Sequence, residues 1–124
     1  MGKITPGIKK LIEKNALGLS TVGKNNRPHS IAVACVKVVG DKVIITNTHI
    51  RESLKNIEQN EQVALVVWNK DWEKACVGFE LQGKAENHIT GKWLDFVKKM
   101  PDNEGYDVKS AIVVDISRIK RLVS

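Results

Sequence analysis

The chain has 124 residues, of which 42% are hydrophobic and 27% are charged. This composition excludes a disordered chain and predicts one folded domain over residues 1–124. Lys and Arg together number 20 and Asp and Glu 14, which gives a formal net charge of +6. The cations are scattered rather than gathered in a tail, so they permit an anionic partner without requiring one.

The sequence contains no segment that predicts export or membrane insertion. Its longest apolar run, residues 31–36, is far shorter than the roughly 20 residues of a membrane-spanning helix. The N-terminus has no apolar core of signal-peptide length. Cys35 and Cys76 lie in apolar, strand-like runs without a CxxC motif, and we predict buried free thiols. These features together predict a cytoplasmic protein.

The first quarter of the chain predicts a helix followed by a strand. Thr5 is a suitable N-cap with Pro6 at the first helical position, and Asn15 can end the helix. Residues 16–22 then form a short apolar run that predicts a strand. Residues 23–28 are rich in Gly and Asn and contain a proline, which predicts a turn.

The middle of the chain alternates strands with one helix. Residues 30–39 are almost continuously small or β-branched, which predicts one strand covered on both faces. A turn at 40–42 joins it to a second strand over 43–47, so the two form a hairpin. Helical spacing follows over 50–60, and residues 62–68 predict a further strand.

The last third predicts a long strand, a helix and a final strand. The long strand covers 75–86, and Gly78 and Gly83 mark candidate bulges or close backbone contacts within it. Thr90 is expected to cap the helix, and the final strand covers 111–116. Six strands joined mostly by short turns predict a mainly β fold. We expect an antiparallel sheet closed into a small barrel with peripheral helices.

Motifs of common enzyme classes are missing from the sequence. It has no GxGxxG, no GxxxxGK[ST] and no GxSxG. The three histidines, His29, His49 and His88, have no metal-ligand spacing, so we interpret them as turn or surface residues. We therefore predict no catalytic side chains and no metal site.

Four stretches carry a resemblance to a known family. They are LSTV with RPHS over 19–30, ITN leading into RESLKNI over 45–57, NEQVAL over 60–65, and GFELQGKAE over 78–86. In order and spacing, the region from 16 to 86 resembles the FMN-binding split β-barrel family, the pyridoxamine-5′-phosphate-oxidase-like proteins. The resemblance implies a six-stranded antiparallel Greek-key split barrel. It also implies a homodimer that holds one FMN per subunit in a groove at its interface.

The function implied by this resemblance is that of a flavoprotein. FMN would perform the redox chemistry, and the protein would act as an oxidoreductase or electron carrier toward a small-molecule or protein redox partner. Family members that resemble the vitamin B6 oxidase itself use further basic residues near a longer C-terminus, which argues against that reaction here. Haem-binding and deazaflavin-binding relatives of the family stay open as alternatives.

The resemblance also implies positions that contact the cofactor. They are Ala32, Val33 and Ala34 on a strand, Thr46, Asn47 and Thr48 after another strand, and Glu52 and Ser53 at a helix start. The family commonly has lysine where this chain has Glu52, and a carboxylate there would repel a phosphate. Arg51 or Lys55 can supply the missing charge. We predict that Arg51 is the main phosphate ligand and that Glu52 points away, toward solvent or a lysine.

The residues themselves reach part of this interpretation independently. A helix start with Thr48, Arg51 and Ser53 combines free N–H groups, hydroxyls and positive charge, which suits an anion. The alternative is that Thr48 only caps the helix and Arg51 is solvated. Residues 30–39 and 63–68 are apolar beyond what a small barrel interior needs, which independently predicts a dimer.

The tryptophans leave two further questions open. Trp68 and Trp72 flank a turn and could form an aromatic wall for a flavin or pack in a dimer interface, whereas Trp93 is predicted to be a core residue. Exposed tryptophans and a charge of +6 also permit a basic small-barrel module for single-stranded nucleic acid. Such grooves need aromatics spaced along strands with lysines between them, and this chain has only six aromatic residues.

Overall fold

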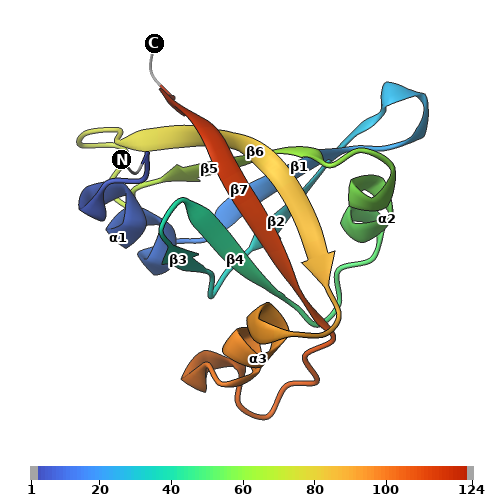
Figure 1. Cartoon of the computed structure of the whole chain (residues 1–124). Coiled ribbons are helices and arrows are strands. Elements are labelled where there is room, and N and C mark those ends of the chain that lie inside the picture. Colours follow the sequence, from blue (N-terminus) through green and yellow to red (C-terminus); the bar gives the residue numbers. More distant parts are fainter. Residues whose placement is uncertain (1–2, 123–124) are drawn as a thin grey trace.

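Figure 1 shows the computed structural model of the chain, which describes residues 3–122. The helices are α1 (Pro6–Lys14), α2 (Glu52–Gln59) and α3 (Lys92–Lys98). The strands are β1 (Leu17–Val22), β2 (Pro28–Val33), β3 (Lys37–Val39), β4 (Lys42–Asn47), β5 (Gln62–Trp68), β6 (Gly78–His88) and β7 (Ser110–Arg121). They form one strongly curved sheet in the order β2-β1-β5-β6-β7-β4-β3.

The mainly β, antiparallel architecture is confirmed, but six strands and a closed barrel are wrong. Every strand pairing is antiparallel. The run predicted as one strand over 30–39 is divided into β2 and β3, because Cys35 has a φ of 57°. A residue in this left-handed region cannot continue an extended strand. β2 and β3 become the two edges of the sheet, and no ladder joins them within residues 3–122.

The expectation of a strand covered on both faces is also wrong for the 30–39 run. Ala32 and Ala34 are exposed, and the strands buried on both faces are β4 and β7. One side of β4 packs into the main core with α1, which contributes Ile8 and Ile12. The opposite side, at Ile44, packs in a second cluster under α3.

Local signals in the sequence have mixed outcomes at the helices and turns. Thr5 caps α1, since its Oγ1 accepts from the N–H of Ile8 at 3.3 Å, and the turn before β2 contains two asparagines with positive φ. The cap predicted at Thr90 is wrong, because α3 has Gly91 at its N-cap with no side-chain hydrogen bond. No helix among the described residues is long and apolar enough to span a membrane.

Gly83 confirms a bulge predicted from the sequence. The β6–β7 register shifts between Gln82 and Gly83, and a Cβ at Gly83 would lie 2.1 Å from the carbonyl oxygen of Asp115. Only glycine permits this approach. The bulge bends β6, which curves across the whole molecule together with β7 (Figure 1).

The cysteine prediction is wrong. Cys35 and Cys76 are both exposed free thiols. Cys35 lies in the irregular link between β2 and β3, and Cys76 precedes β6, which begins at Gly78 rather than at residue 75. Apolar neighbours in the sequence therefore did not place either thiol in the core. Trp93 is half-buried and packs against the α3 cluster.

Candidate functional site

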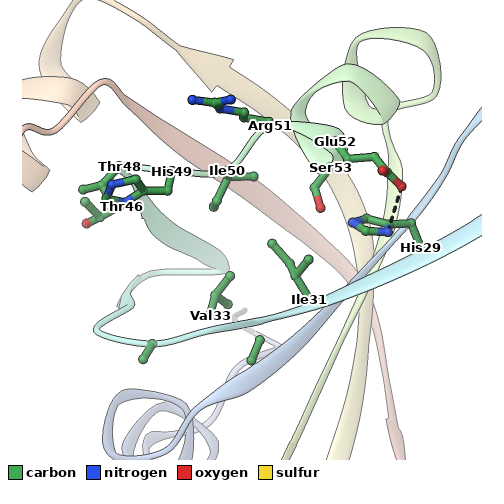
Figure 2. A pocket seen from close by; sticks show the side chains of 12 residues that line it. His29, Ile31, Val33, Thr46, Thr48, His49, Ile50, Arg51, Glu52 and Ser53 are labelled. Atoms are coloured by element: carbon green, nitrogen blue, oxygen red, sulfur yellow. Dashed lines mark hydrogen bonds and ion pairs between the residues drawn. The ribbon is translucent and has the colours of Figure 1, made fainter.

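A cavity of about 400 Å³ opens between β2 and the segment that leads from β4 into α2 (Figure 2). We call it the β2–α2 pocket. Its lining residues are His29, Ile31, Ala32, Val33, Ala34, Thr46, Thr48, His49, Ile50, Arg51, Glu52 and Ser53. Its volume lies within the range of about 300–1,000 Å³ that is usual for small-molecule sites.

Ser53 is the most unusual residue of the β2–α2 pocket. It lies in the first turn of α2 and is only 1% exposed. Its Oγ is buried without a hydrogen-bond partner, and Figure 2 shows the side chain pointing from α2 toward Ile31 and Val33. Buried hydroxyls are normally hydrogen-bonded. The Ser53 hydroxyl lacks a partner, so its proton is free to be donated to a molecule bound in the cavity.

Arg51 occupies the N-cap of α2 and supplies positive charge at the pocket rim. Its side chain is exposed and makes no ion pair with any carboxylate in residues 3–122. Asn47 holds the loop that carries Arg51, because its Oδ1 accepts a hydrogen bond from the Ile50 N–H at 2.7 Å. The Asn47 amide in turn donates to Ser110 Oγ at 2.9 Å.

Glu52 lines the pocket but is paired there. Its Oε2 lies 2.9 Å from Nδ1 of His29 on β2. The Glu52 side chain is 67% exposed, which agrees with the prediction that it points toward solvent, and its partner is a pocket histidine rather than a lysine. This pairing reduces the repulsion that the carboxylate would exert on a bound anion.

Two threonines add hydroxyl groups on the opposite wall. Thr46 Oγ1 accepts a hydrogen bond from the Asn103 amide at 2.9 Å, so its own proton remains available for another acceptor. Thr48 Oγ1 lies 2.9 Å from Nδ1 of His49. Thr48 does not cap α2, which begins at Glu52.

The structure brings together eight of the nine residues predicted to contact a cofactor. They are Ala32, Val33, Ala34, Thr46, Thr48, Arg51, Glu52 and Ser53. The ninth, Asn47, is buried and holds the loop rather than lining the cavity.

Sequence reasoning missed four residues of the pocket lining: His29, Ile31, His49 and Ile50. The first two could have been found, because His29, Ile31 and Val33 alternate along β2 and therefore share its inner face. His49 and Ile50 lie in the irregular loop before α2, where no periodicity exists to place them.

The exposed tryptophans lie elsewhere. Trp68 is 47% exposed and Trp72 is 55% exposed; Trp68 is the last residue of β5, and Trp72 lies in the connection between β5 and β6. Neither lines the β2–α2 pocket of its own chain. Among residues 3–122 no group of three His, Cys, Asp or Glu side chains is placed to hold a metal ion.

The fold agrees with the comparison to known families. The model of the pyridoxamine 5′-phosphate oxidase family matches residues 4–120, and the chain belongs to this family. An uncharacterised protein of Methanocaldococcus jannaschii is 28% identical over 128 residues, which cover 98% of this chain and 83% of that protein.

Several solved structures share the fold at lower identity. HupZ of Group A Streptococcus has a TM-score of 0.87 at 21% identity, covering 98% of this chain and 95% of that one. An FMN-binding protein of Syntrophomonas wolfei has a TM-score of 0.82 at 20% identity, covering 94% and 84%. An F420 reductase (22% identity, covering 94% and 98%) and the haem storage protein HutZ of Vibrio cholerae (16%, covering 95% and 94%) both have TM-scores of 0.72.

Proposed function

We propose that this protein is an FMN-binding flavoprotein that acts as an oxidoreductase or electron carrier. The observation that carries the proposal is the buried, unpartnered hydroxyl of Ser53 in the β2–α2 pocket, which Arg51 also lines. This donor set fits a phosphate, which accepts several hydrogen bonds and needs a compensating cation. The FMN-binding protein with the same fold supports the choice of ligand.

Each part of the pocket has a role in this proposal. Ser53 and Arg51 bind the phosphate, and the Thr46 and Thr48 hydroxyls can bind further polar groups. Ala32 on β2 and Ala34 just after it have no side-chain donors, so this segment contributes its backbone and leaves space beside it. When bound, FMN supplies the hydride or single-electron transfer. The chain's own task is to bind and orient the cofactor and to exclude water from its inner side.

We further propose that the protein is a homodimer. Small side chains lie next to one another on one face of β2, β1 and β5, and we call this the small-residue face: Gly18, Ser20, Ser30, Ala32, Ala64 and Val66. Register pairs these residues side by side, and a Cβ at Gly18 would lie 2.8 Å from Val66 Cγ1. The face continues into the pocket at Ala32, so a second copy packed there would border the cofactor site.

A haem-binding function is the second candidate. His29 and His49 both line the β2–α2 pocket, and histidine is a common axial ligand of haem iron. HutZ, described as a haem storage protein, has the same fold. The nucleic-acid alternative has less support, because Trp68 and Trp72 lie at one end of a hairpin rather than along a strand face.

Reconstitution of the purified protein distinguishes these functions. Equal samples are mixed with FMN, riboflavin, haem or the deazaflavin F420, and free ligand is removed. We expect stoichiometric FMN with quenched fluorescence, and weaker retention of riboflavin, which lacks the phosphate. Preferential retention of haem with a histidine-type absorption spectrum would replace the proposal by the second candidate. Binding of none of the four would reject both.

A further inference from the structure

The pair formed by His29 and Glu52 has a chemical property beyond simple neutralisation. Nδ1 of His29 lies 2.9 Å from Glu52 Oε2. An ionised carboxylate only accepts hydrogen bonds, so this contact places the proton of the neutral imidazole on Nδ1. Nε2 then carries a lone pair, which would repel an anion. A second proton at Nε2 would convert the same nitrogen into a charged donor.

The position of the ring directs this second nitrogen into the pocket. His29 is on the inner face of β2, and its side chain is 27% exposed. Figure 2 shows the ring extending from the Glu52 contact toward the side of the pocket where Ser53 lies. Arg51 and Glu52 together carry no net charge, so protonation of His29 adds a positive charge to this side of the pocket.

We propose that His29 is an anion ligand of the β2–α2 pocket that works in its protonated form. Binding of a phosphate group therefore takes up one proton from solvent at Nε2. Glu52 holds the ring in place and stabilises the imidazolium. This inference rests on the proposed function for the identity of the ligand, but the anion site itself can be tested without any flavin.

Other charged groups near this pair must be taken into account. Arg51 and His49 line the same pocket. On the other side of Glu52, a second groove contains Lys24, Arg27 and Lys55. The lysines and arginines keep their charge near neutral pH, so they add a constant attraction. His49 is the second histidine of the pocket, so its signals must be followed separately.

The proposal fixes the sign of the pH dependence. A bound anion favours the protonated imidazole of His29, so affinity is highest where the ring is protonated and falls as rising pH removes that proton. By linkage, the change in proton affinity equals the change in anion affinity. The phosphate of FMN itself ionises with a second pKa of about 6. Sulfate is therefore the cleaner probe, because it stays a dianion throughout.

The chain contains a matched control pair outside the pocket. His88 Nε2 lies 2.9 Å from Glu86 Oε1, with the histidine side chain 26% exposed. Distance and exposure are almost the same as for His29 and Glu52. Neither residue lines the β2–α2 pocket. A general effect of salt would move both histidines, whereas a bound anion would move His29 alone.

The test is a pH titration of the histidine ring protons by NMR, with signals assigned through His29→Gln, His49→Gln and His88→Gln. The whole protein is titrated in chloride, in sulfate at equal ionic strength, and with FMN or riboflavin. We expect sulfate and FMN to keep the His29 ring signals in their protonated positions to higher pH than chloride does. Riboflavin should not move these signals, and His88 should stay unchanged in every condition.

Variants give an independent readout. His29→Gln keeps a donor for Glu52 but cannot titrate. The roughly tenfold loss of sulfate affinity expected between about pH 6 and pH 8 should disappear in this variant and persist in His88→Gln. Equal shifts of both histidines, or an unmoved His29 in protein that binds FMN, overturn the inference and leave the flavin function intact. A sulfate response of His29 without flavin binding keeps the anion site and rejects the FMN proposal.

Discussion

Replacing Ser53 by alanine should have opposite effects on the free protein and on its FMN complex. In the free protein the Ser53 hydroxyl is 1% exposed and unpartnered, and an unsatisfied buried polar group costs about 1–3 kcal/mol. Removing the hydroxyl relieves this cost, but it also removes the packing contacts of the oxygen atom. We therefore expect the free energy of unfolding to stay unchanged or to rise by up to about 1 kcal/mol.

The same change should weaken the complex. A hydrogen bond to a charged phosphate contributes about 1.5–3 kcal/mol, which corresponds to roughly 10- to 100-fold in Kd. Riboflavin affinity should hardly change, because riboflavin has no phosphate. The two effects are separable by urea denaturation without ligand and by fluorescence titration with each flavin.

Ser110→Ala is the matched control for this experiment. Ser110 is also 1% exposed, but its Oγ accepts from the Asn47 amide at 2.9 Å. Its removal should destabilise the free protein by about 1 kcal/mol. If Ser53→Ala destabilises the free protein as much as Ser110→Ala does, the Ser53 hydroxyl is not a free donor. Equal losses for FMN and riboflavin would place the phosphate elsewhere.

Four further predictions address the charges and surfaces around the site. Arg51→Ala should weaken FMN by about 1.5–3 kcal/mol and leave riboflavin unaffected in parallel fluorescence titrations; an equal loss for both would deny Arg51 a phosphate contact. Glu52→Lys should tighten FMN in the same assay, since it replaces a repelling charge with an attracting one. Val66→Arg on the small-residue face should yield monomers by light scattering at low micromolar concentration, while Val39→Arg on exposed β3 should not; a monomeric parent protein would reject the dimer. Hydrogen bonds from the Ile4 N–H and, after it, the Lys3 N–H lower the pKa of the Asp41 carboxyl. The ionised carboxylate therefore stabilises the folded protein above the unfolded pKa of about 3.9. This stabilisation is lost as pH falls through the lower folded pKa. Asp41→Asn should therefore destabilise the protein near pH 7 in urea denaturation, with a difference from the parent protein that closes in acid; a constant difference would contradict this assignment.

The spacing of apolar residues predicted most of the fold, because most elements keep either the helical or the strand spacing from end to end. The alternation over β5 and the cap at Thr5 are local signals that tertiary contacts reinforce. The run over 30–39 failed because its composition is uniformly apolar or small, so nothing in it marked Cys35 as the residue that leaves the extended region. Barrel closure failed for the same reason, since the break turns one predicted strand into two sheet edges.

The site was predictable where neighbours in the sequence are neighbours in space. Arg51, Glu52 and Ser53 lie within one turn at the start of α2, so the sequence alone indicated their common location. The relation between Glu52 and His29 was not predictable, because 23 positions of chain separate them and only the packing of β2 beside α2 brings them within 2.9 Å. Pairings across elements depend on register and side-chain direction, which composition does not specify.

This pairing changes how the departure of Glu52 from the family pattern should be understood. A lysine at that position would give the pocket a fixed positive charge, and anion binding would then be insensitive to the state of His29. With Glu52 at that position, the charge on this side of the pocket depends instead on whether the neighbouring His29 is protonated. In the proposed site a protonated His29 offsets the Glu52 carboxylate and Arg51 supplies a second positive charge, so anion affinity depends on both side chains.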